Sequence, residues 1–530
     1  MKKIVFISLL LFLFPIYIYA DNPVIKDTYT ADPATLVHDG KVYLYTGHDE
    51  ATTNDSFFVL KKWNIYSSID LENWKLEGSL DRQAFDWAKH DSAWASQVVE
   101  KNGVFYWYVT VRNNDATEPG YAIGVATSDN PVTGWKDAIG GPLISPSMTE
   151  DPEHMGTDPW DDIDPTVYVD DDGEAYMYWG NTHLYYAKLK DNMIEIDGDI
   201  KRIEINNLDG SFTEGPWLDK YEGNYYLTFA MNYPEEIGYA MATSPEGPWT
   251  FKGKIMNRLS NSATSHPAIL HFQEQNYFVY HTASLPNGGE FRRSVSIEDL
   301  HYFEDGTIAP ITPTASGVSG PSYMLQLIDT NLALKEQTLF LSLEEKEEVN
   351  YNYRWYQTPA LNQSNHVNVV SFQSENNPGF YLVKEGDYIR LKKNDGTDAF
   401  KDAASFRLVP GMSDEKAYSI QPVNDDTVVL AKSENNGVSF QSKEQLTNDT
   451  DATFLITALE DIIPEQMEKE AVNQPEVEEN QVQEESQVEE VNTKEETDEA
   501  NNTTYIVIGL VSLLLVVFLS LVFINKKRKK

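Results

Sequence analysis

Five stretches of the chain share one pattern of hydrophobic and polar positions. Each begins with a short apolar strand, continues through a polar turn such as HDG, KNG or YEG, and ends in a strand where aromatic residues alternate with other residues. This pattern predicts a β-hairpin. The five predicted hairpins begin at Ala31, Trp94, Ile163, Thr213 and Ser265.

The hairpins recur at intervals of about 50–70 residues, and several are followed by a third strand and a segment that ends in tryptophan, as in YAIGVATSDNPVTGW. Units of about four strands that repeat around an axis form a β-propeller. The repeats therefore predict an all-β fold with a five-bladed β-propeller over residues 21–320. The alternative is a β-sandwich whose hairpins resemble one another by chance.

One position in the repeat carries acidic residues. The residue that opens the first strand is, in the order of the repeats, Asp32, Ala95, Asp164, Glu214 and His266. The innermost strand of every propeller blade runs beside the central axis, so equivalent positions form a ring around one end of it. We therefore expect three carboxyl groups and one imidazole to converge in a funnel.

Three carboxyl groups at one site fit two kinds of chemistry. Acids that lie together cannot all ionise comfortably, so their pKa values separate. A protonated carboxyl can then act as general acid and an ionised one as general base, as glycoside hydrolysis requires. The same side chains, with acidic segments such as DDDGE nearby, could instead bind calcium. The spacing of these residues favours neither interpretation strongly.

The composition excludes several classes of site. The 530 residues include no cysteine, so disulfides, thiolate metal sites and cysteine nucleophiles are excluded. The net charge is −42, and much of it lies in residues 460–502, which are rich in Glu, Gln, Val, Asn and Thr. Such a run predicts a disordered, self-repelling linker. An acidic chain with no basic patch before its last residues is not expected to bind nucleic acid.

Both ends of the chain carry hydrophobic segments typical of membrane targeting. Residues 1–20 have a basic start, an apolar run and a small residue before Asp21, which predicts a cleaved secretory signal peptide. An uncleaved anchor helix is the alternative. Residues 503–525 predict a transmembrane helix, and the basic tail 526–530 should stay cytoplasmic. The protein is therefore predicted to lie at the extracellular face of the cell membrane, held by a single C-terminal anchor.

Four motifs, in order along the chain, resemble glycoside hydrolase family 43. They are YTADPATLVHDGKVYLYTGHDE, DDIDPTVYVDDDGEAYMYWGN, FTEGPWL and GGEFRRSVSIEDLHYFEDGTI. The resemblance covers residues 22–313 and implies a five-bladed propeller enzyme that acts on polysaccharides containing arabinose and xylose. It also implies that Asp32 is the general base and Glu214 the general acid. Asp164 would then be the residue that tunes the pKa of the acid and orients it.

The resemblance extends to other residues of the site. His266 matches a histidine that binds a central water network or, in some members, structural calcium; no cofactor is required. One arginine of the last blade is expected to contact the substrate. Arg292 and Arg293 both match, and strand alternation allows only one of them to point inward. Apart from the resemblance, Trp94 and Trp217 are expected near the active end by their places in the repeats, as substrate-binding residues, with packing within a blade as the alternative.

The motifs KKWNIYSSIDLENW and SAWASQVVEKNGVFYWYV are similar to those of the arabinofuranosidases in the family. We therefore predict an inverting, exo-acting α-L-arabinofuranosidase that removes arabinose from arabinoxylan or arabinan. A β-xylosidase with the same acids is the second interpretation. A propeller that binds polysaccharide without hydrolysing it is the third.

A different repeat follows the propeller, after a connecting region at residues 321–366. Either this region supplies a third copy of the repeat in diverged form, or the domain is incomplete. Residues 367–459 hold two copies of a strand–turn–strand pattern, which predict a β-trefoil-like domain and resemble arabinofuranose-binding modules. The positions that bind sugar in such modules are altered: Lys384 and Lys432 replace histidine, and the aspartate is kept as Asp451 but replaced by Ala403. Whether this domain still binds sugar is left open by the sequence.

Overall fold

The structure is a computed structural model, and it describes residues 21–89, 92–149, 159–318, 320–337, 340–364, 366, 368–460 and 462. The predicted signal peptide, transmembrane helix and basic tail lie outside these residues, as does nearly all of the predicted linker. The chain divides into two compact units, residues 1–472 and 473–530, and every described residue belongs to the first. Within the described ranges, no helix is long and apolar enough to cross a membrane.

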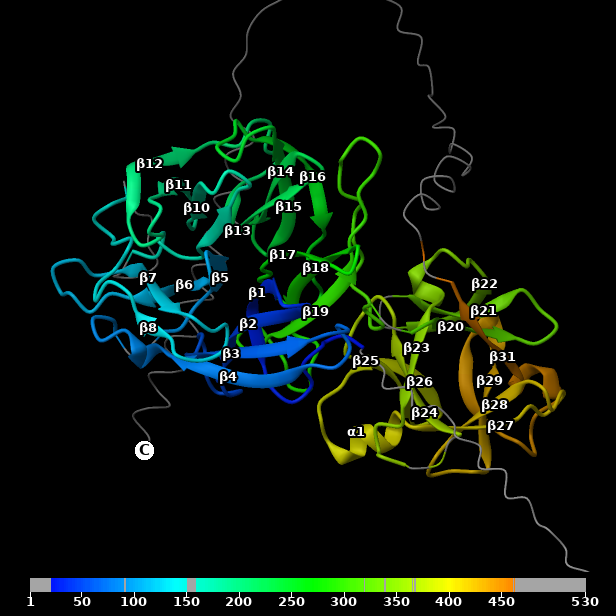
Figure 1. Cartoon of the computed structure of the whole chain (residues 1–530). Helices are drawn as coiled ribbons and strands as arrows, with labels where there is room; N and C mark the ends of the chain where they lie inside the picture. The colour runs from blue at the N-terminus through cyan, green and yellow to red at the C-terminus, as the bar shows by residue number, and fades with distance from the viewer. Residues whose placement is uncertain are drawn as a thin grey trace, which may run out of the picture. The chain divides into compact units, whose positions relative to one another are not determined.

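The N-terminal part of the chain forms five antiparallel sheets around a central axis (Figure 1). The sheets consist of β1 (Thr30–His38), β2 (Lys41–Asp49), β3 (Leu60–Ser68) and β4 (Lys75–Asp81); β5 (Ser96–Lys101), β6 (Val104–Arg112), β7 (Tyr121–Ser128) and β8 (Lys136–Asp137); β9 (Thr166–Val169), β10 (Ala175–Trp179), β11 (Leu184–Leu189) and β12 (Ile196–Ile203); β13 (Phe212–Tyr221), β14 (Asn224–Met231), β15 (Glu236–Ala242) and β16 (Thr250–Met256); and β17 (Ala268–Phe272), β18 (Gln275–Thr282) and β19 (Ser294–Asp299).

The first strands of the five sheets form a closed ring. Each packs against the first strands of both neighbouring sheets, in the order β1, β5, β9, β13, β17 and back to β1. The five predicted hairpins are β1–β2, β5–β6, β9–β10, β13–β14 and β17–β18. The prediction of a five-bladed β-propeller is therefore confirmed, and the β-sandwich alternative is excluded.

The last blade is completed by the first described residues of the chain. The Val24 N–H donates to the Val295 carbonyl at 2.9 Å, and the Asn22 side chain accepts from the Ile297 N–H at 2.9 Å. Asn22 also donates to Glu298 at 2.8 Å. The start of the propeller is thus hydrogen-bonded to its end, which helps to hold the ring closed in a protein without disulfides.

Aromatic side chains fill the spaces between blades. In β6, Trp107 packs in a cluster shared with the first blade, and its neighbour Tyr108 packs in a cluster shared with the third. Successive residues of a strand point to opposite faces of the sheet, so an alternating aromatic strand can serve two interfaces at once. Burying one large apolar side chain contributes about 1.5–3 kcal/mol. Packing between blades is therefore a main source of the stability of the propeller.

A second all-β region follows the propeller. It forms one sheet of twelve strands within the described residues: β20 (Ser322–Leu327), β21 (Leu332–Gln337), β22 (Phe340–Glu345), β23 (Trp355–Pro359), β24 (Val369–Ser374), β25 (Phe380–Glu385), β26 (Tyr388–Lys393), β27 (Phe406–Pro410), β28 (Tyr418–Pro422), β29 (Val428–Lys432), β30 (Val438–Ser442) and β31 (Phe454–Leu459). The helical segments are α1 (Asp398–Ala403) and the short 3₁₀ turns Arg82–Ala84, Tyr351–Tyr353, Glu434–Asn436 and Asp449–Ala452.

The segment 321–366, for which the sequence predicts a connecting region or a diverged third copy of the repeat, contains strands. It contributes β20–β23, and β20 pairs with β31 from Ser322↔Leu459 to Leu327↔Phe454. Trp355 of β23 is fully buried in a core that also contains residues of the later strands, such as Phe406. The C-terminal domain therefore begins at β20.

Candidate active site

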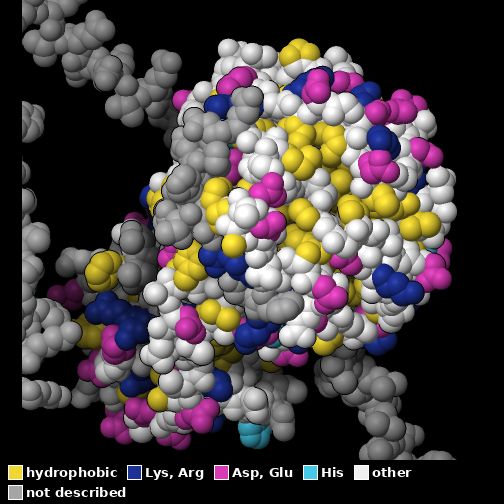
Figure 2. Space-filling model, turned by 90° about the vertical axis from the view of Figure 1, so that its left-hand side faces the viewer, with side chains coloured by type: hydrophobic (Ala, Val, Ile, Leu, Met, Phe, Trp, Pro, Cys, Tyr) yellow, Lys and Arg dark blue, Asp and Glu magenta, His cyan; other side chains and the backbone are white. Residues whose placement is uncertain are grey.

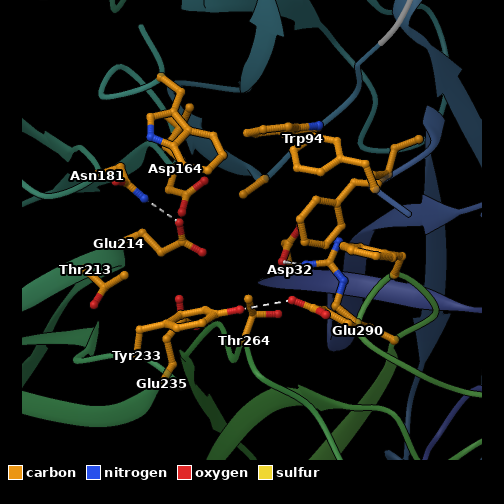
Figure 3. A pocket seen from close by; sticks show the side chains of 18 residues that line it. Asp32, Trp94, Asp164, Asn181, Thr213, Glu214, Tyr233, Glu235, Thr264 and Glu290 are labelled. Carbon is orange, nitrogen blue, oxygen red and sulfur yellow. Dashed lines mark hydrogen bonds and ion pairs between the residues drawn. The ribbon is translucent and has the colours of Figure 1, made fainter. Parts of the chain in front are cut away.

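A cavity of about 460 Å³ opens at one end of the propeller axis (Figure 3). Small-molecule sites usually have volumes of about 300–1,000 Å³, so the cavity has room for a sugar. Its lining residues come from all five blades or the loops beside them: Asp32, Phe57, Phe58, Leu60, Trp94, Ala95, Trp160, Ile163, Asp164, Asn181, Thr213, Glu214, Tyr233, Glu235, Thr264, Glu290, Phe291 and Arg293. The predicted convergence of Asp32, Asp164 and Glu214 is thus observed.

The backbone turns these side chains into the cavity through unusual conformations. Asp32 and Asp164 have φ values of +50° and +59°, and Gly215 has +60°. The left-handed region is uncommon for residues other than glycine, although aspartate tolerates it better than most. The pairing of β1 with β2 shifts between Ala31 and Ala34, beside Asp32. Bulges of this kind commonly re-aim a side chain next to an active site.

Asp32 is held as a carboxylate by a buried cation. Arg293 Nη1 donates to Asp32 Oδ1 at 2.8 Å, while Nε and Nη2 of the same guanidinium donate to the two oxygens of Asp49 at 2.9 and 3.0 Å. His281 Nδ1 lies 3.4 Å from Asp32 Oδ1. Burial alone would raise the pKa of Asp32, but Arg293 and His281 overcome this effect and hold the pKa below its usual range.

Asp164 is held by one hydrogen bond to its carboxyl group and one from its backbone. Its Oδ2 accepts from the Gly215 N–H at 3.0 Å, and its own N–H donates to Thr110 Oγ1 at 3.0 Å. Burial raises the pKa of Asp164 well above its ordinary value, and the carboxyl groups of Glu214 and Asp32 raise it further. A residue in this environment can carry a proton that Asp32 cannot.

Glu214 projects from β13 into the cavity. The Asn181 amide donates to Glu214 Oε2 at 2.7 Å, which fixes one carboxyl oxygen (Figure 3). Burial raises the pKa of Glu214, and the negative charge of Asp32 adds to the effect. The site therefore combines an acid that favours its protonated form with a carboxylate that favours its ionised form.

His266 occupies the fifth position of the predicted ring without lining the cavity. Its Nδ1 lies 3.8 Å from Asp164 Oδ2, and burial lowers its pKa to about 4, so the imidazole is neutral. A Cβ on Gly215 would lie 3.1 Å from the same Nδ1. The ring is therefore packed closely against the strand that carries Glu214.

The calcium predicted at His266 stays a prediction. Asp164 Oδ2 lies 3.8 Å from His266 Nδ1, and the six to eight oxygen ligands that calcium prefers can include water. Across the part of the chain that the structure describes, no group of three or more His, Asp or Glu side chains is placed to hold a metal ion.

Of the two candidate arginines, one lines the cavity and the other does not. Arg293 is 5% exposed and lines the cavity. Arg292 points away from it and donates to the backbone carbonyls of Asn287 and Thr52 at 2.6 and 3.0 Å. One arginine points inward, as alternation predicted, but its hydrogen bonds go to Asp32 and Asp49. Substrate contact through Arg292 is not supported by this placement.

The two candidate tryptophans also differ. Trp94 lines the cavity and stacks on Tyr121 with ring centroids 4.1 Å apart. Trp217 does not line it; the side chain is 6% exposed and packs in the core shared with the fifth blade. Glu214 pairs with Ala230 and Trp217 with Thr228, so three steps along β13 match two along β14. Simple strand alternation therefore does not give the direction of Trp217, and its placement does not support substrate contact.

Several lining residues were not predicted from the sequence. Asn181, Glu235, Tyr233 and Glu290 come from loops between strands, where no repeat pattern marks them. Phe57, Phe58 and Phe291 form one aromatic cluster, with centroids of Phe58 and Phe291 4.8 Å apart. Two signals in the sequence could have indicated this aromatic cluster: the adjacent residues Phe57 and Phe58, and Phe291 directly before the two arginines.

Two family models match the chain. The glycosyl hydrolases family 43 model matches residues 20–308, more than half of the chain, and the alpha-L-arabinofuranosidase B (ABFB) domain model matches residues 329–456. The second match begins within the segment that contributes β20–β23, in agreement with the extent of the C-terminal sheet.

Characterised proteins with similar sequences carry related names. The chain is 30% identical over 346 residues to an arabinoxylan arabinofuranohydrolase of Bacillus subtilis (strain 168). The alignment covers 56% of this chain and 65% of that protein. It is 28% identical over 344 residues to the xylosidase/arabinosidase 43A of Humicola insolens, covering 55% and 99%. The chain thus spans just under two thirds of the length of the first of these relatives.

A solved structure of a β-xylosidase/α-arabinofuranosidase from a compost microbial metagenome, in complex with xylotriose, has a TM-score of 0.48 and 28% identity. The superposition covers 55% of this chain and 97% of the chain in that structure. The extent of the family match, on a five-bladed propeller whose three acids meet in one cavity, shows that the chain belongs to glycoside hydrolase family 43.

Proposed function

We propose that the protein is an inverting, exo-acting α-L-arabinofuranosidase that removes arabinose from arabinoxylan or arabinan. The observation that carries the proposal is the unequal environment of two carboxyl groups in one cavity. Arg293 donates to Asp32 Oδ1 at 2.8 Å and holds the pKa of Asp32 below its usual range, whereas Glu214 accepts from the neutral Asn181 amide at 2.7 Å and burial raises its pKa. A propeller that only bound polysaccharide would need no such difference.

In the proposed reaction, Glu214 donates its proton to the glycosidic oxygen as the bond from that oxygen to the anomeric carbon breaks. Asp32 accepts a proton from a water molecule, whose oxygen forms the new bond to the anomeric carbon from the opposite face. The sugar leaves with inverted configuration, and both carboxyl groups return to their starting states by exchange with solvent. Asp164 orients the site through the Gly215 N–H, next to the acid.

The cavity supports recognition of one terminal sugar. Trp94 and the cluster of Phe57, Phe58 and Phe291 offer apolar faces, and the Tyr233 hydroxyl donates to Glu290 Oε1 at 3.0 Å between two loops that line it (Figure 3). Figure 2 shows acidic, basic and hydrophobic side chains interspersed over one face of the molecule. Recognition of a neutral polysaccharide would then depend on the cavity rather than on a surface of one charge.

A β-xylosidase activity is the second candidate. It is favoured by the relative named xylosidase/arabinosidase and by the same acid pair, which both pentoses could use. Incubation of the purified protein with an aryl α-L-arabinofuranoside and an aryl β-D-xyloside separates the two. We expect a higher kcat/KM for the arabinofuranoside and release of free arabinose from arabinoxylan. Faster hydrolysis of the xyloside would reverse the order, and failure to cleave either glycoside would reject the proposed activity.

We also infer that the C-terminal domain is a β-trefoil. Its twelve described strands fall along the chain into three groups of four, β20–β23, β24–β27 and β28–β31, which is the number that a trefoil requires. An experimental structure of this domain without a pseudo-threefold axis would contradict the inference.

We further propose that the enzyme acts at the extracellular face of the cell membrane. The support is the sequence of residues 1–20, 503–525 and 526–530, which read as a signal peptide, an anchor and a cytoplasmic tail. We expect the full chain in the membrane fraction, and a chain ending at Val472 in the supernatant with the same specific activity. Membrane retention of the shortened chain would contradict the anchor.

A further inference from the structure

The loop between β18 and β19, residues 283–293, carries part of the wall of the cavity. Its residues Glu290, Phe291 and Arg293 line the cavity. Phe291 belongs to the aromatic cluster described above, and Arg293 supplies the buried cation beside the proposed general base. The position of this β18–β19 loop therefore affects how a sugar fits into the site.

The C-terminal domain contacts the middle of the β18–β19 loop. Lys393, the last residue of β26, donates from Nζ to the Gly288 carbonyl at 3.0 Å. Gly396 faces the same part of the loop, because a Cβ on this glycine would lie 3.2 Å from Pro286 Cβ and 3.4 Å from Asn287 Nδ2. The domain therefore contacts the residues that come directly before the cavity-lining part of the loop.

A second contact of the C-terminal domain lies at the start of the loop. A Cβ on Gly379 would be only 2.4 Å from the Ser284 carbonyl oxygen, so this close approach of two backbones requires glycine. The Asn394 N–H donates to the Gly379 carbonyl at 2.9 Å, and β25 pairs with β26 at Phe380↔Lys393. Gly379 and Lys393 therefore lie together at the open end of one hairpin.

The propeller holds the same loop through side-chain hydroxyl groups. The Tyr29 hydroxyl donates to the Pro286 carbonyl at 2.7 Å, and the Tyr233 hydroxyl donates to Glu290 Oε1 at 3.0 Å. The β18–β19 loop is thus held partly by the propeller and partly by the C-terminal domain.

We propose that Lys393 and Gly379 position the β18–β19 loop, so that the C-terminal domain helps to shape the sugar-binding cavity of the propeller. The inference rests on the proposed glycosidase function. Lys393 is a positioning residue, since it acts on the cavity through the Gly288 carbonyl. A wall that is already ordered spares the free-energy cost of ordering it when the sugar binds, and it therefore lowers KM.

This role differs from the binding of polysaccharide by the C-terminal domain. A domain that only binds polysaccharide would change the hydrolysis of arabinoxylan and leave small substrates unaffected. A domain that positions the loop affects both, because both kinds of substrate place a sugar in the same cavity. The test therefore uses whichever of the two aryl glycosides, the α-L-arabinofuranoside or the β-D-xyloside, the wild type cleaves faster.

The first comparison is between Lys393→Met and Lys392→Met in the full chain. Lys392 is a matched control, because it is the neighbouring lysine and pairs with Glu385 of its own hairpin. We expect Lys393→Met to raise KM by about 3–30-fold, since a hydrogen bond from a charged donor is lost. Its kcat should stay within about twofold of the wild type, because Arg293 is held separately by Asp49.

The second comparison is between Gly379→Ala and Gly386→Ala. Both glycines have positive φ values, +88° and +62°, so alanine brings backbone strain at either position. A Cβ on Gly386 would meet no described atom within 4 Å, whereas one on Gly379 would press on Ser284. Gly379→Ala should therefore raise KM, and Gly386→Ala should keep the wild-type KM.

A wild-type KM for the aryl glycoside in Lys393→Met would overturn the proposal, as would an effect confined to arabinoxylan. An equal rise of KM in Lys392→Met would also overturn it, because the effect would then not depend on the contact with Gly288. If Gly379→Ala fails to fold, the two lysine variants still decide.

Hydrogen exchange measured by mass spectrometry gives a readout that does not require activity. Amides of residues 283–293 should exchange faster in Lys393→Met than in Lys392→Met, because the loop has lost one of its fixed points. Equal exchange would overturn the positioning role even if both variants are active. Faster exchange in a protein whose wild type cleaves neither aryl glycoside would refute the proposed function and leave the positioning of the loop in place.

Discussion

Replacement of Glu214 by glutamine, or of Asp32 by asparagine, is expected to lower kcat/KM on a polysaccharide substrate by about 10²–10⁴-fold, the usual contribution of general acid–base catalysis. Each amide keeps the size of its carboxyl group but removes the proton donor or acceptor. The measurement is steady-state kinetics of both variants on arabinoxylan, with circular dichroism to show that the fold is unchanged.

The two variants should respond differently to the leaving group. An aryl glycoside with an acidic phenol needs little protonation, so it should partly restore the activity of Glu214→Gln. It should not restore Asp32→Asn, which lacks the group that activates water. Equal rescue of both variants would show that the two roles are wrongly assigned.

Replacement of Arg293 by methionine is expected to destabilise the fold by about 3–5 kcal/mol, the usual cost of leaving a buried charge without its partner. Arg293 donates hydrogen bonds to both Asp32 and Asp49, which are 8% and 1% exposed. Its neighbour Arg292 is a matched control, because its side-chain hydrogen bonds go to backbone carbonyls. Urea denaturation of Arg293→Met and Arg292→Met measures the difference.

The same substitution should change the pH dependence of activity and stability. Arg293 depresses the pKa of Asp32 in the folded protein, so its removal should move the acidic limb of kcat/KM to higher pH. In the wild type, a depressed carboxyl pKa contributes stability that is present above the unfolded value and is lost as the pH falls. The difference in stability between wild type and variant should therefore shrink below about pH 4. A pH-independent difference would argue that Arg293 acts by packing alone.

The repeat in the sequence was sufficient to predict the propeller and the meeting of Asp32, Asp164 and Glu214, because equivalent positions on equivalent strands must share one end of the axis. The direction of side chains on irregular backbone was harder to predict. Trp217 lies three residues from Glu214, but the irregular pairing of β13 directs it into the core. Nearness in the sequence was therefore a poor guide to nearness in the site.

The repeat gave no prediction of the residues that reach the site through tertiary contacts. Glu235 and Asn181 come from loops, and the hydrogen bond from Asn181 to Glu214 joins residues 33 apart. The pairing of Asp49 with Arg293 spans 244 residues. Likewise, β20–β23 have no clear sequence repeat, yet they complete the C-terminal sheet through the pairing of β20 with β31.

The most direct test of the account is proton NMR of the first sugar released from an aryl α-L-arabinofuranoside, recorded before mutarotation equilibrates the anomers. The roles assigned to Asp32 and Glu214 require a single displacement by water, which inverts the anomeric centre. The account therefore predicts that β-L-arabinofuranose appears first and the α-anomer only later. Initial release of the α-anomer would indicate a double displacement and would contradict the assignment of Asp32 as a base that activates water.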